Sequence, residues 1–494
     1  MGRKSFFTGV FFWAIIGLNG QNITEDIYNI QADHNLMGGI VTIVCENDYY
    51  QTIPFGLADY ERQIWANEET MYRIASISKS VTAVAFMQLV EQGLIGLDED
   101  VSSYLGFELT NPNGPFVSIT ARQLLSHTSS IVDGSGYSNF LSATYNQNPI
   151  PPLSDLLEIG GAYYTADMFN NKTPGTYFNY SNINFGIIGT LIESLSNQRF
   201  DEYVKEHVLD PLEIAGSFNV NHIDDIDNIA VLYRKISGNW VAQADNYQGI
   251  QPVYGNLDGY IPGTNGLRFA PQGGLRISAP DILKIFIALS TSGSYYGIQI
   301  LEPETTVMMR SEEWLYNGSN GNDYYGLFKS WGLGVHRITN TPNSDMVLSI
   351  SDFMFGHPGE AYGLVSDVYM DTEQDIGLAF ITNGCGEGYE IGDESAFYTV
   401  EKEIFDVVST ELENANCLLS TEEEYQSEPS FYYLRSSHQL RLSGELHGVL
   451  QVYGVDGQIV FEKQASNHQI QLPGLSSGVY FARLGKETIK FVIH

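Results

Sequence analysis

The stretch from Tyr72 to Ala83, Tyr-Arg-Ile-Ala-Ser-Ile-Ser-Lys-Ser-Val-Thr-Ala, constrains the fold of this chain more than any other. It opens a densely apolar run that ends at Gly93, and this pattern predicts a buried helix of about four turns. Its first turn carries Ser76 and Lys79, and side chains three residues apart lie on one face of a helix. A lysine kept neutral by burial can take the proton of a serine hydroxyl, and helix N–H groups favour the resulting alkoxide. A capping serine beside a surface lysine is the alternative, but the chain contains no other Ser-x-x-Lys.

The composition is that of a large globular protein, and the charge excludes one class of partner. The chain has 494 residues, 43% of them hydrophobic, enough for roughly two to four ordinary domains or one large domain with appendages. Its net charge is −35, from 59 acidic and 24 basic residues. This excess of negative charge repels phosphate backbones and anionic lipid surfaces, so we expect no nucleic-acid partner. No later segment approaches the roughly 18 consecutive apolar residues that span a bilayer, so we expect no stable membrane insertion.

The N-terminus has the pattern of a signal peptide. Basic residues Arg3 and Lys4 precede an almost uncharged run from Phe6 to Leu18 and then Gly20. A basic start, a short apolar run and a small residue near the cleavage site are typical of exported chains. We therefore expect residues 1–20 to be a signal peptide.

The cysteines cannot supply a disulfide framework. There are three, Cys45, Cys385 and Cys417, so at least one thiol has no partner within the chain. Cys45 and Cys385 lie in or beside apolar strand-like runs and are interpreted as small buried residues, although the pairing stays open. The spacing of cysteine and histidine indicates no metal site.

Strand-like segments lie at both ends of residues 21–410, with helical patterns between them. This order predicts an α+β fold in which both ends contribute to one antiparallel sheet flanked by helices, with an all-helical part inserted. The expected strands are 38–45, 325–336, 346–354, 363–370 and 376–382, with a hairpin at 48–66 turning at 56–59. The last helix is expected at 395–410, an acidic linker at 411–430 and a small all-β sandwich at 431–494. Segments 133–173 and 215–270 are candidate cleft walls.

A second motif, Tyr180-Ser181-Asn182, supplies groups that could help Lys79 exchange protons with a leaving group. A phenol near an ammonium can share its proton, and an amide can orient the lysine and bind a substrate carbonyl. Spacing alone does not single this triplet out, because Tyr137, Tyr177 and Tyr254 also precede an asparagine by two positions. Only the 180–182 triplet lies between a Pro-Gly turn and an apolar helix. His127 is interpreted as a residue that bonds locally and holds its turn, rather than as a ligand or base.

A third motif, Phe355-Gly-His-Pro-Gly-Glu360, contains the chain's only His-x-Gly. Glycine lets a backbone approach a substrate closely, and an oxyanion hole needs two N–H donors. Pro358 has no N–H, so the N–H groups of Ser76 and Glu360 are the candidate donors. A β-turn with a surface histidine is the structural alternative.

Together and in this order, the three motifs resemble the pattern of the serine β-lactamases and penicillin-binding proteins, over about residues 30–405. The Tyr-x-Asn and His-x-Gly forms are most similar to the class C-type branch with its esterases and D-amino-acid peptidases. The resemblance implies the β-lactamase/transpeptidase-like fold, with Ser76 as the acylated nucleophile and Lys79 and Tyr180 as its acid/base pair. It also implies these substrate-binding residues: Asn182, His357, Gly359 and Glu360.

The chain departs from this family at two positions, His357 and Ser130. His357 stands where many members have a lysine and is largely neutral at pH 7, while Glu360 adds negative potential if its side chain faces the cleft. We therefore expect weak capture of substrate carboxylates, poor β-lactamase activity and better turnover of neutral esters or amine-bearing peptides. Ser130 stands where the family often has a glycine, and the sequence alone gives its effect no interpretation.

The sequence therefore predicts an exported serine hydrolase that acts on a small ester or peptide through an acyl-Ser76 intermediate, without metal or organic cofactor. A β-lactamase or D-Ala-D-Ala carboxypeptidase is the alternative, as is a slow-acylating or inactive penicillin- or peptide-binding protein. Residues 431–494 resemble the type IX secretion sorting domain of exported Bacteroidetes proteins. That resemblance implies recognition by secretion machinery and a secreted or cell-surface location, reached through the periplasm.

Overall fold

The structure is a computed structural model. It describes residues 23–252, 257, 259–387, 389–415 and 417, and the segments 431–434, 439–442, 448–454, 458–465, 469–472, 475, 478–484 and 487–493. The expected signal peptide at 1–20 and most of the expected linker at 411–430 lie outside the described residues.

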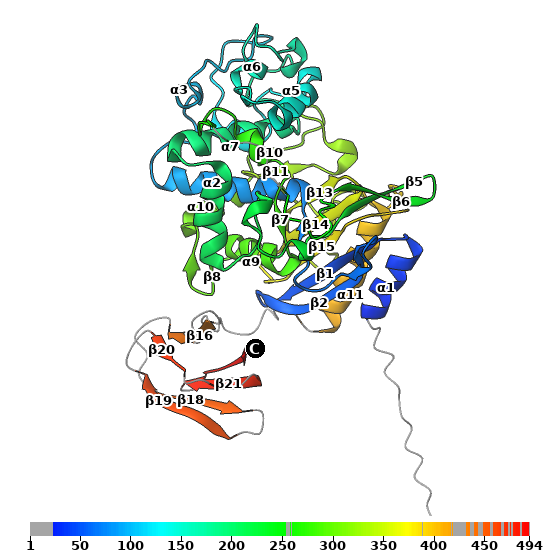
Figure 1. Cartoon of the computed structure of the whole chain (residues 1–494), viewed down its shortest axis with the longest axis vertical. Coiled ribbons are helices and arrows are strands. Elements are labelled where there is room, and N and C mark those ends of the chain that lie inside the picture. Colours follow the sequence, from blue (N-terminus) through cyan, green and yellow to red (C-terminus); the bar gives the residue numbers. More distant parts are fainter. Residues whose placement is uncertain are drawn as a thin grey trace, which may run out of the picture.

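A nine-stranded antiparallel sheet forms the centre of the fold (Figure 1). Its order is β10-β11-β12-β13-β14-β15-β1-β2-β3, so β1 (Gly38–Cys45) pairs with β15 (Gly377–Thr382) from the other end of the domain. The prediction of one sheet built from both ends of an α+β domain is therefore confirmed. The remaining strands are β2 (Asp48–Asp59), β3 (Ile64–Trp65), β10 (Trp314–Leu315), β11 (Ser330–Trp331), β12 (His336–Arg337), β13 (Phe355–Ala361) and β14 (Leu364–Met370).

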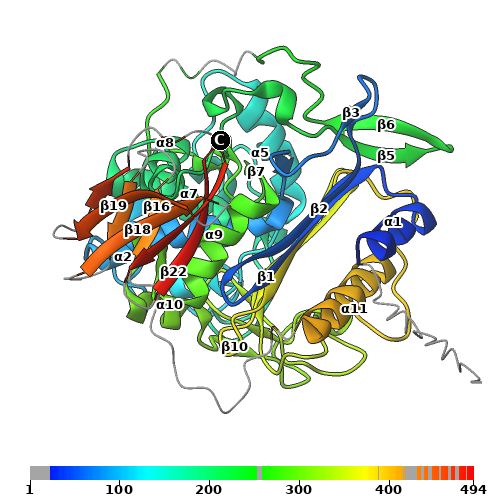
Figure 2. The ribbon, with the colours of Figure 1, turned by 90° about the horizontal axis from the view of Figure 1, so that it is seen from below.

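Helices cover both faces of this sheet (Figure 2). One face packs on α1 (Ile23–Asp33) and α11 (Thr399–Asn414), and the other packs on α9 (Ala279–Ser290) and α2 (Ser78–Glu91). Seven of the eight residues of β1 are buried, which agrees with a strand covered on both faces. The buried apolar side chains of α11 recur at helical spacing: Val400, Ile404, Phe405, Val408 and Leu412.

The helical part is inserted between β3 and β10 and encloses α2. Twelve of the 14 residues of α2 are buried, so this helix has no polar surface face. Beside it lies α7 (Asn182–Ser196), where a Cβ on Gly186 would lie only 2.5 Å from the Leu267 side chain, so only glycine permits this close packing. The other helices are α3 (Ser102–Leu105), α4 (Ala121–Leu125), α5 (Ser135–Asn146), α6 (Ser154–Leu157), α8 (Phe200–Val204) and α10 (Pro303–Arg310).

Several sequence-based boundaries were wrong. The turn expected at 56–59 is part of β2, and the chain turns at 60–63 instead. The last helix ends at Asn414, four residues inside the expected linker, and α1 was not predicted. Residues 346–354 form no strand, because Val347, Leu348 and Met354 cover the sheet and α11 from an irregular segment. Within 325–336 only the short strand β11 and the start of β12 form.

The C-terminal strands form two antiparallel sheets, ordered β16-β17-β20 and β19-β18-β21-β22. Leu440 and Ile470 from the first sheet and Leu450, Val452 and Ala482 from the second belong to one apolar cluster. Two sheets around one core agree with the expected small all-β unit. The strands are β16 (Phe431–Leu434), β17 (Gln439–Leu442), β18 (Gly448–Gly454), β19 (Ile459–Ala465), β20 (Gln469–Gln471), β21 (Gly478–Leu484) and β22 (Glu487–Ile493).

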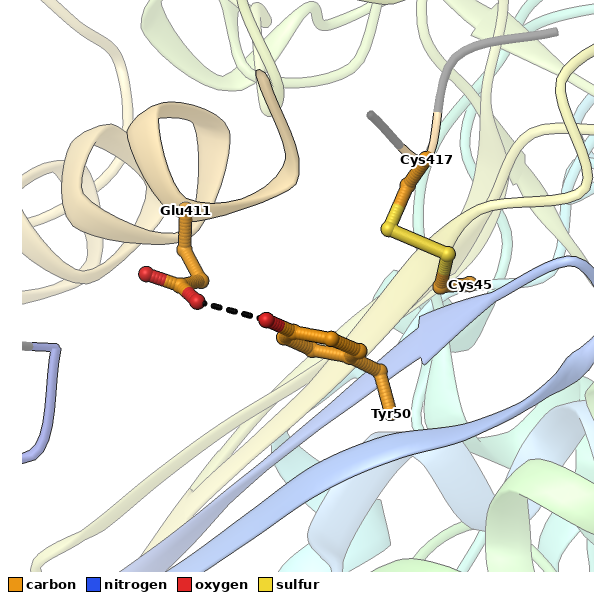
Figure 3. The surroundings of a disulfide bond; sticks show 4 residues. All are labelled: Cys45, Tyr50, Glu411 and Cys417. Carbon is orange, nitrogen blue, oxygen red and sulfur yellow. Dashed lines mark hydrogen bonds between the residues drawn. A yellow bond between two sulfur atoms is a disulfide. The ribbon is translucent and has the colours of Figure 1, made fainter. Parts of the chain in front are cut away.

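One disulfide joins Cys45 at the end of β1 to Cys417, just beyond α11 (Figure 3). The interpretation of Cys45 as a small buried residue was therefore wrong, whereas Cys385 is a buried free thiol. Near the disulfide, the hydroxyl of Tyr50 donates a 2.8 Å hydrogen bond to Glu411. Among the helices in the described part of the chain, none has the length and apolarity needed to cross a membrane.

Candidate active site

Ser76 lies in a single 3₁₀ turn, Ala75–Ile77, that leads directly into α2. The preceding strand β4 (Tyr72–Arg73) pairs with β7 (Arg276–Ile277), and this pairing anchors the turn. Ala75 has a φ of 45°, an uncommon left-handed conformation for a residue with a Cβ. The serine therefore precedes the α-helix by two residues, rather than lying within its first turn as expected, and its side chain is half-buried.

The Lys79 amine lies 2.9 Å from Ser76 Oγ, as the three-residue spacing predicts. The lysine is fully buried, and this burial lowers its pKa to about 7. It donates hydrogen bonds of 2.9 Å to Asn182 Oδ1 and to the carbonyl oxygen of Gln272. A neutral amine has two N–H groups and one lone pair, so these two acceptors leave the lone pair directed at Ser76. The geometry is that of a base next to a nucleophile.

Tyr180 completes a cluster of three groups. Its hydroxyl is hydrogen-bonded to Ser76, and its ring centroid lies 4.8 Å from the Lys79 amine. Burial raises the pKa of this phenol well above its ordinary value, so the hydroxyl keeps its proton at neutral pH. The structure thus brings together all three residues that the sequence marked for chemistry, with the lysine able to accept a proton and the phenol able to donate one.

His127 packs against Tyr180 and holds its backbone in place. Its ring lies 4.4 Å from the Tyr180 ring, and its Nδ1 accepts a hydrogen bond from the Ser181 N–H at 3.1 Å. Its carbonyl oxygen accepts from the Asn179 N–H at 2.8 Å, so His127 holds the backbone on both sides of Tyr180. Burial and the nearby lysine lower the pKa of His127 well below its usual range, which keeps the ring neutral. This local bonding agrees with the interpretation made from the sequence.

Ser130, at the end of the same turn, has a φ of 69°. A glycine adopts this left-handed conformation without strain. In this chain the Ser130 hydroxyl accepts a 2.8 Å hydrogen bond from the Asn111 side chain. The departure from glycine therefore leaves the turn intact.

Strand β13 passes directly beside the nucleophile turn, the 3₁₀ turn Ala75–Ile77 that carries the candidate nucleophile Ser76. A Cβ on Gly359 would lie 2.7 Å from the Ile74 carbonyl oxygen and 2.4 Å from Ser366 Oγ, so only glycine allows this approach. The backbone of Glu360 follows immediately on the same strand. The approach is compatible with the two-donor oxyanion hole that the sequence suggested.

The side chains of His357 and Glu360 lie on opposite faces of the sheet. His357 pairs with Val368, in the core that contains α2, and it is fully buried with its ring 6.0 Å from Tyr180. Its Nδ1 donates to the Pro358 carbonyl oxygen at 2.6 Å, and burial lowers its pKa well below the usual range. Glu360 pairs with Val365 on the α11 face and accepts a 2.7 Å hydrogen bond from the Tyr398 hydroxyl. The Glu360 carboxylate therefore does not face the cluster around Ser76, contrary to one condition considered from the sequence.

Two contributors to the site were missed by sequence reasoning. Gln272 precedes a Gly-Gly-Leu segment, and its backbone carbonyl is a partner of Lys79. Asp133 lies three residues after Ser130 and binds the Tyr-x-Asn motif. A backbone acceptor leaves no mark in the sequence, whereas the aspartate was visible but was assigned to a surface segment. Across the described residues, no group of three or more histidine, cysteine, aspartate or glutamate side chains could hold a metal ion.

Comparisons with known proteins agree with this geometry. The sequence profile of the family described as Beta-lactamase matches residues 24–396. Protein flp of Staphylococcus aureus strain MW2 is 29% identical over 187 residues, 38% of this chain and 35% of that relative, so the chain matches only about a third of its length.

Two solved structures share the fold. EstCE1, a hydrolase with promiscuous acyltransferase activity, has a TM-score of 0.58 and 20% identity, covering 78% of this chain and 98% of its own. The D-amino acid amidase of Ochrobactrum anthropi SV3, in complex with L-phenylalanine amide, has a TM-score of 0.58 and 19% identity over 80% and 99% of the two chains. With the family profile covering most of the chain, this protein belongs to the β-lactamase family of hydrolases.

Proposed function

We propose that the protein is an exported serine hydrolase that forms an acyl-enzyme on Ser76 and hydrolyses a small ester or amide. One observation carries the proposal: the Lys79 amine lies 2.9 Å from Ser76 Oγ, while Asn182 and Gln272 accept its two N–H groups. A lysine with a pKa of about 7 is substantially neutral at neutral pH and can act as a general base there.

Acylation replaces the bond between the acyl carbon and the leaving group with a bond to Ser76 Oγ, and the proton of Ser76 is transferred in the process. As Ser76 Oγ attacks the substrate carbonyl carbon, its proton passes to the Lys79 amine and a tetrahedral oxyanion forms. When the carbon–oxygen or carbon–nitrogen bond to the leaving group breaks, that group takes a proton from Tyr180 or from the Lys79 ammonium, and the two exchange it between them. A water molecule then attacks the acyl carbon and gives one proton to the Lys79 amine. As the bond from the acyl carbon to Ser76 Oγ breaks, Oγ takes this proton back, directly from Lys79 or through Tyr180, and the acid is released.

The oxyanion needs two N–H donors during both steps. The N–H groups of Ser76 and Glu360 are the candidates, because Gly359 brings β13 against the turn that carries Ser76. Pro358 has no N–H to offer. The role of Gly359 in this arrangement is to permit the close approach.

We further propose that the site prefers neutral esters or amine-bearing amides over substrates with a carboxylate. His357 is buried and neutral, so it offers no positive charge. Arg73, three residues before Ser76, has its Nε and Nη2 occupied by Asp245 at 3.0 and 2.8 Å. Glu360 takes no part in this preference, because its side chain lies on the other face of the sheet. EstCE1 is a hydrolase with promiscuous acyltransferase activity and the Ochrobactrum anthropi protein is a D-amino acid amidase, which supports this substrate class.

The proposal is tested by measuring turnover of short-chain esters, D-aminoacyl amides and cephalosporins by the full chain and by Ser76→Ala. We expect the esters or amides to be hydrolysed, the cephalosporins to be poor substrates, and Ser76→Ala to be inactive. Intact mass spectrometry of the quenched reaction should detect one acyl group on the wild-type protein and none on the variant.

The same experiment separates the alternatives. Cephalosporin turnover that rivals ester turnover would favour a β-lactamase or carboxypeptidase. Stable labelling of Ser76 by a penicillin without turnover would indicate a slow-acylating binding protein. Failure of a fluorophosphonate to label Ser76 would exclude a functional nucleophile at this position.

We also propose that residues 1–20 and 431–494 direct export, so that the mature hydrolase is secreted or held at the cell surface by way of the periplasm. Support comes from the basic and apolar N-terminal pattern and from the small all-β C-terminal unit. Deleting 431–494 in a host with type IX secretion should retain active enzyme in the periplasm. Unchanged surface or medium activity of the truncated protein would refute a sorting role.

A further inference from the structure

Asp133 binds the Tyr-x-Asn motif through both carboxylate oxygens. Its Oδ1 accepts hydrogen bonds from the Ser181 hydroxyl at 3.1 Å and the Ile183 N–H at 2.9 Å. Its Oδ2 accepts from the backbone N–H of Asn182 at 3.0 Å and from the side-chain Nδ2 of Asn182 at 2.9 Å. One aspartate from outside the helix thus satisfies two N–H groups of the first turn of α7 and also holds the amide of its first residue.

The contact with Nδ2 determines which end of the Asn182 amide faces Lys79. An ionised carboxylate only accepts hydrogen bonds, so it requires the amide NH₂ on its own side. The amide oxygen is then turned toward Lys79, where it accepts an N–H at 2.9 Å. With the amide reversed, the NH₂ would face the lysine, and the amine would lose one of the two acceptors that orient its lone pair.

We propose that Asp133 is a positioning residue: it fixes the Asn182 amide so that the Lys79 amine keeps its lone pair on Ser76. The inference rests on the proposed function, because the orientation matters for rate only if Lys79 is the base of acylation. Asp133 itself touches neither Ser76 nor the reacting atoms.

The charge of Asp133 has a second, separable effect. It raises the pKa of Lys79, opposing the larger lowering by burial. The other titratable groups that face the lysine are Tyr180, His127 and His357, from the motif, the 127–130 turn and β13. Tyr180 keeps its proton and both histidines are neutral, so Asp133 is the group whose loss changes the charge felt by Lys79.

A purely structural helix cap is the competing explanation, and the chain offers a matched control. Asp167 is also an exposed aspartate, and its carboxylate accepts the N–H and the hydroxyl of Ser135 at 3.0 and 3.1 Å, where α5 begins. Replacing Asp167 removes a similar cap without touching Asn182 or Lys79. Asp133→Ser keeps an acceptor for backbone N–H groups but has no charge and no second oxygen for the amide.

The test is the rate at which a fluorophosphonate labels Ser76 between pH 5 and 9 in the full chain. In wild type the rate should rise with pH as Lys79 loses its proton. In Asp133→Asn and Asp133→Ser the plateau should fall roughly tenfold to a hundredfold, the value of a lost hydrogen bond to an ionisable group. Both variants should also show the rise at lower pH, because removing the negative charge lowers the lysine pKa. Asp167→Asn should match wild type in plateau and midpoint.

A double-mutant cycle isolates the route through Asn182. In an Asn182→Ala background, adding Asp133→Asn should reduce the plateau little further, because the amide that Asp133 orients is gone. The positioning role would be overturned if Asp133→Asn lowered the plateau rate by the same factor in both backgrounds. It would also be overturned if the midpoint of the pH profile did not move and the loss of rate followed the loss of Tm. No labelling of wild-type Ser76 at any pH would instead refute the proposed function, and the inference with it.

Discussion

At the scale of single residues, the site depends on a lysine whose ordinary chemistry is changed by its surroundings. An exposed lysine is charged at neutral pH and has no lone pair to offer a serine. Lys79 is enclosed by α2, α7, the Gln272 backbone and Tyr180, so water does not stabilise its charge. The same enclosure keeps the Tyr180 phenol protonated, so one environment assigns opposite roles to the two groups.

The first prediction concerns the pH dependence of the Lys79 base. Because burial lowers its pKa to about 7, the acylation rate should be low at pH 5 and should rise through about pH 7. Lys79→Met should reduce the rate by about 10²–10⁴-fold and remove this rise, since the general base is gone. Stopped-flow labelling or kcat/KM for a neutral ester, measured from pH 5 to 9, checks both. A profile centred near pH 10 would show that the lysine is not desolvated in solution.

A second prediction concerns the contact between β13 and the nucleophile turn. Gly359→Ala places a Cβ 2.7 Å from the Ile74 carbonyl oxygen, so the strand or the turn must shift. We expect a loss of acylation rate that exceeds the loss of Tm, because the shift displaces the oxyanion donors more than the core. Gly273→Ala is the control, since its Cβ would approach Ala75 no closer than 3.7 Å, an ordinary contact. Equal activity of the two variants would contradict this role of β13.

At the scale of elements, the sequence predicted well what local pattern determines. Helix α2 and strands β1, β14 and β15 are recognisable from their apolar runs, because each is buried along most or all of its length. The spacing of Ser76 and Lys79 is likewise a local pattern. The strand expected at 346–354 does not form, and the one expected at 325–336 is reduced to β11 and the start of β12, because buried apolar residues in both segments pack from irregular backbone. Asp133 was not recognised for a related reason: its hydrogen-bond partners lie 48 to 50 residues further along the chain, beyond the reach of any local pattern.

A third prediction concerns the docking of α11 on the sheet. Asp367 of β14 and Glu401 of α11 are both buried and interact directly. Burial raises the pKa of both carboxyl groups, and the neighbouring Glu401 raises that of Asp367 further. The folded protein therefore retains protons that the unfolded chain releases above about pH 4, so its stability falls as pH rises. Glu401→Gln should leave the stability at pH 4 unchanged and raise Tm increasingly toward pH 8. Each unit of raised pKa corresponds to about 1.4 kcal/mol.

Glu413→Gln is the control for this prediction, because Glu413 is exposed on the same helix. Its Tm should follow that of the wild type at every pH, as monitored by circular dichroism. A Glu401→Gln variant that is less stable than wild type at pH 8 would show that the buried Glu401 carboxyl group does not destabilise the fold at that pH.

At the scale of the whole molecule, the fold closes on itself where its two ends meet. β1 pairs with β15, α1 packs with α11, and the disulfide joins β1 to the residue that follows α11. Helix α2, which carries Lys79, lies on the other face of this sheet. The layer that α1 and α11 form is thus fastened covalently to the sheet whose strand β13 borders the nucleophile turn (Figures 2 and 3).

The last prediction connects this closure with export. Disulfides persist in oxidising compartments, so a chain made with its signal peptide and exported should form the Cys45–Cys417 bond, whereas one retained in a reducing cytosol should not. Because the bond closes a separation of 372 residues, its loss in Cys417→Ser should cost roughly 2–4 kcal/mol of stability. Reductant should lower the Tm of the wild type and leave that of Cys417→Ser unchanged. Cys385→Ser should remain sensitive to reductant like the wild type, since Cys385 is buried and unpaired. If reductant leaves the wild-type Tm unaltered, the disulfide does not fasten the α1 and α11 layer, and hydrogen exchange in α11 should then be equally slow with and without it.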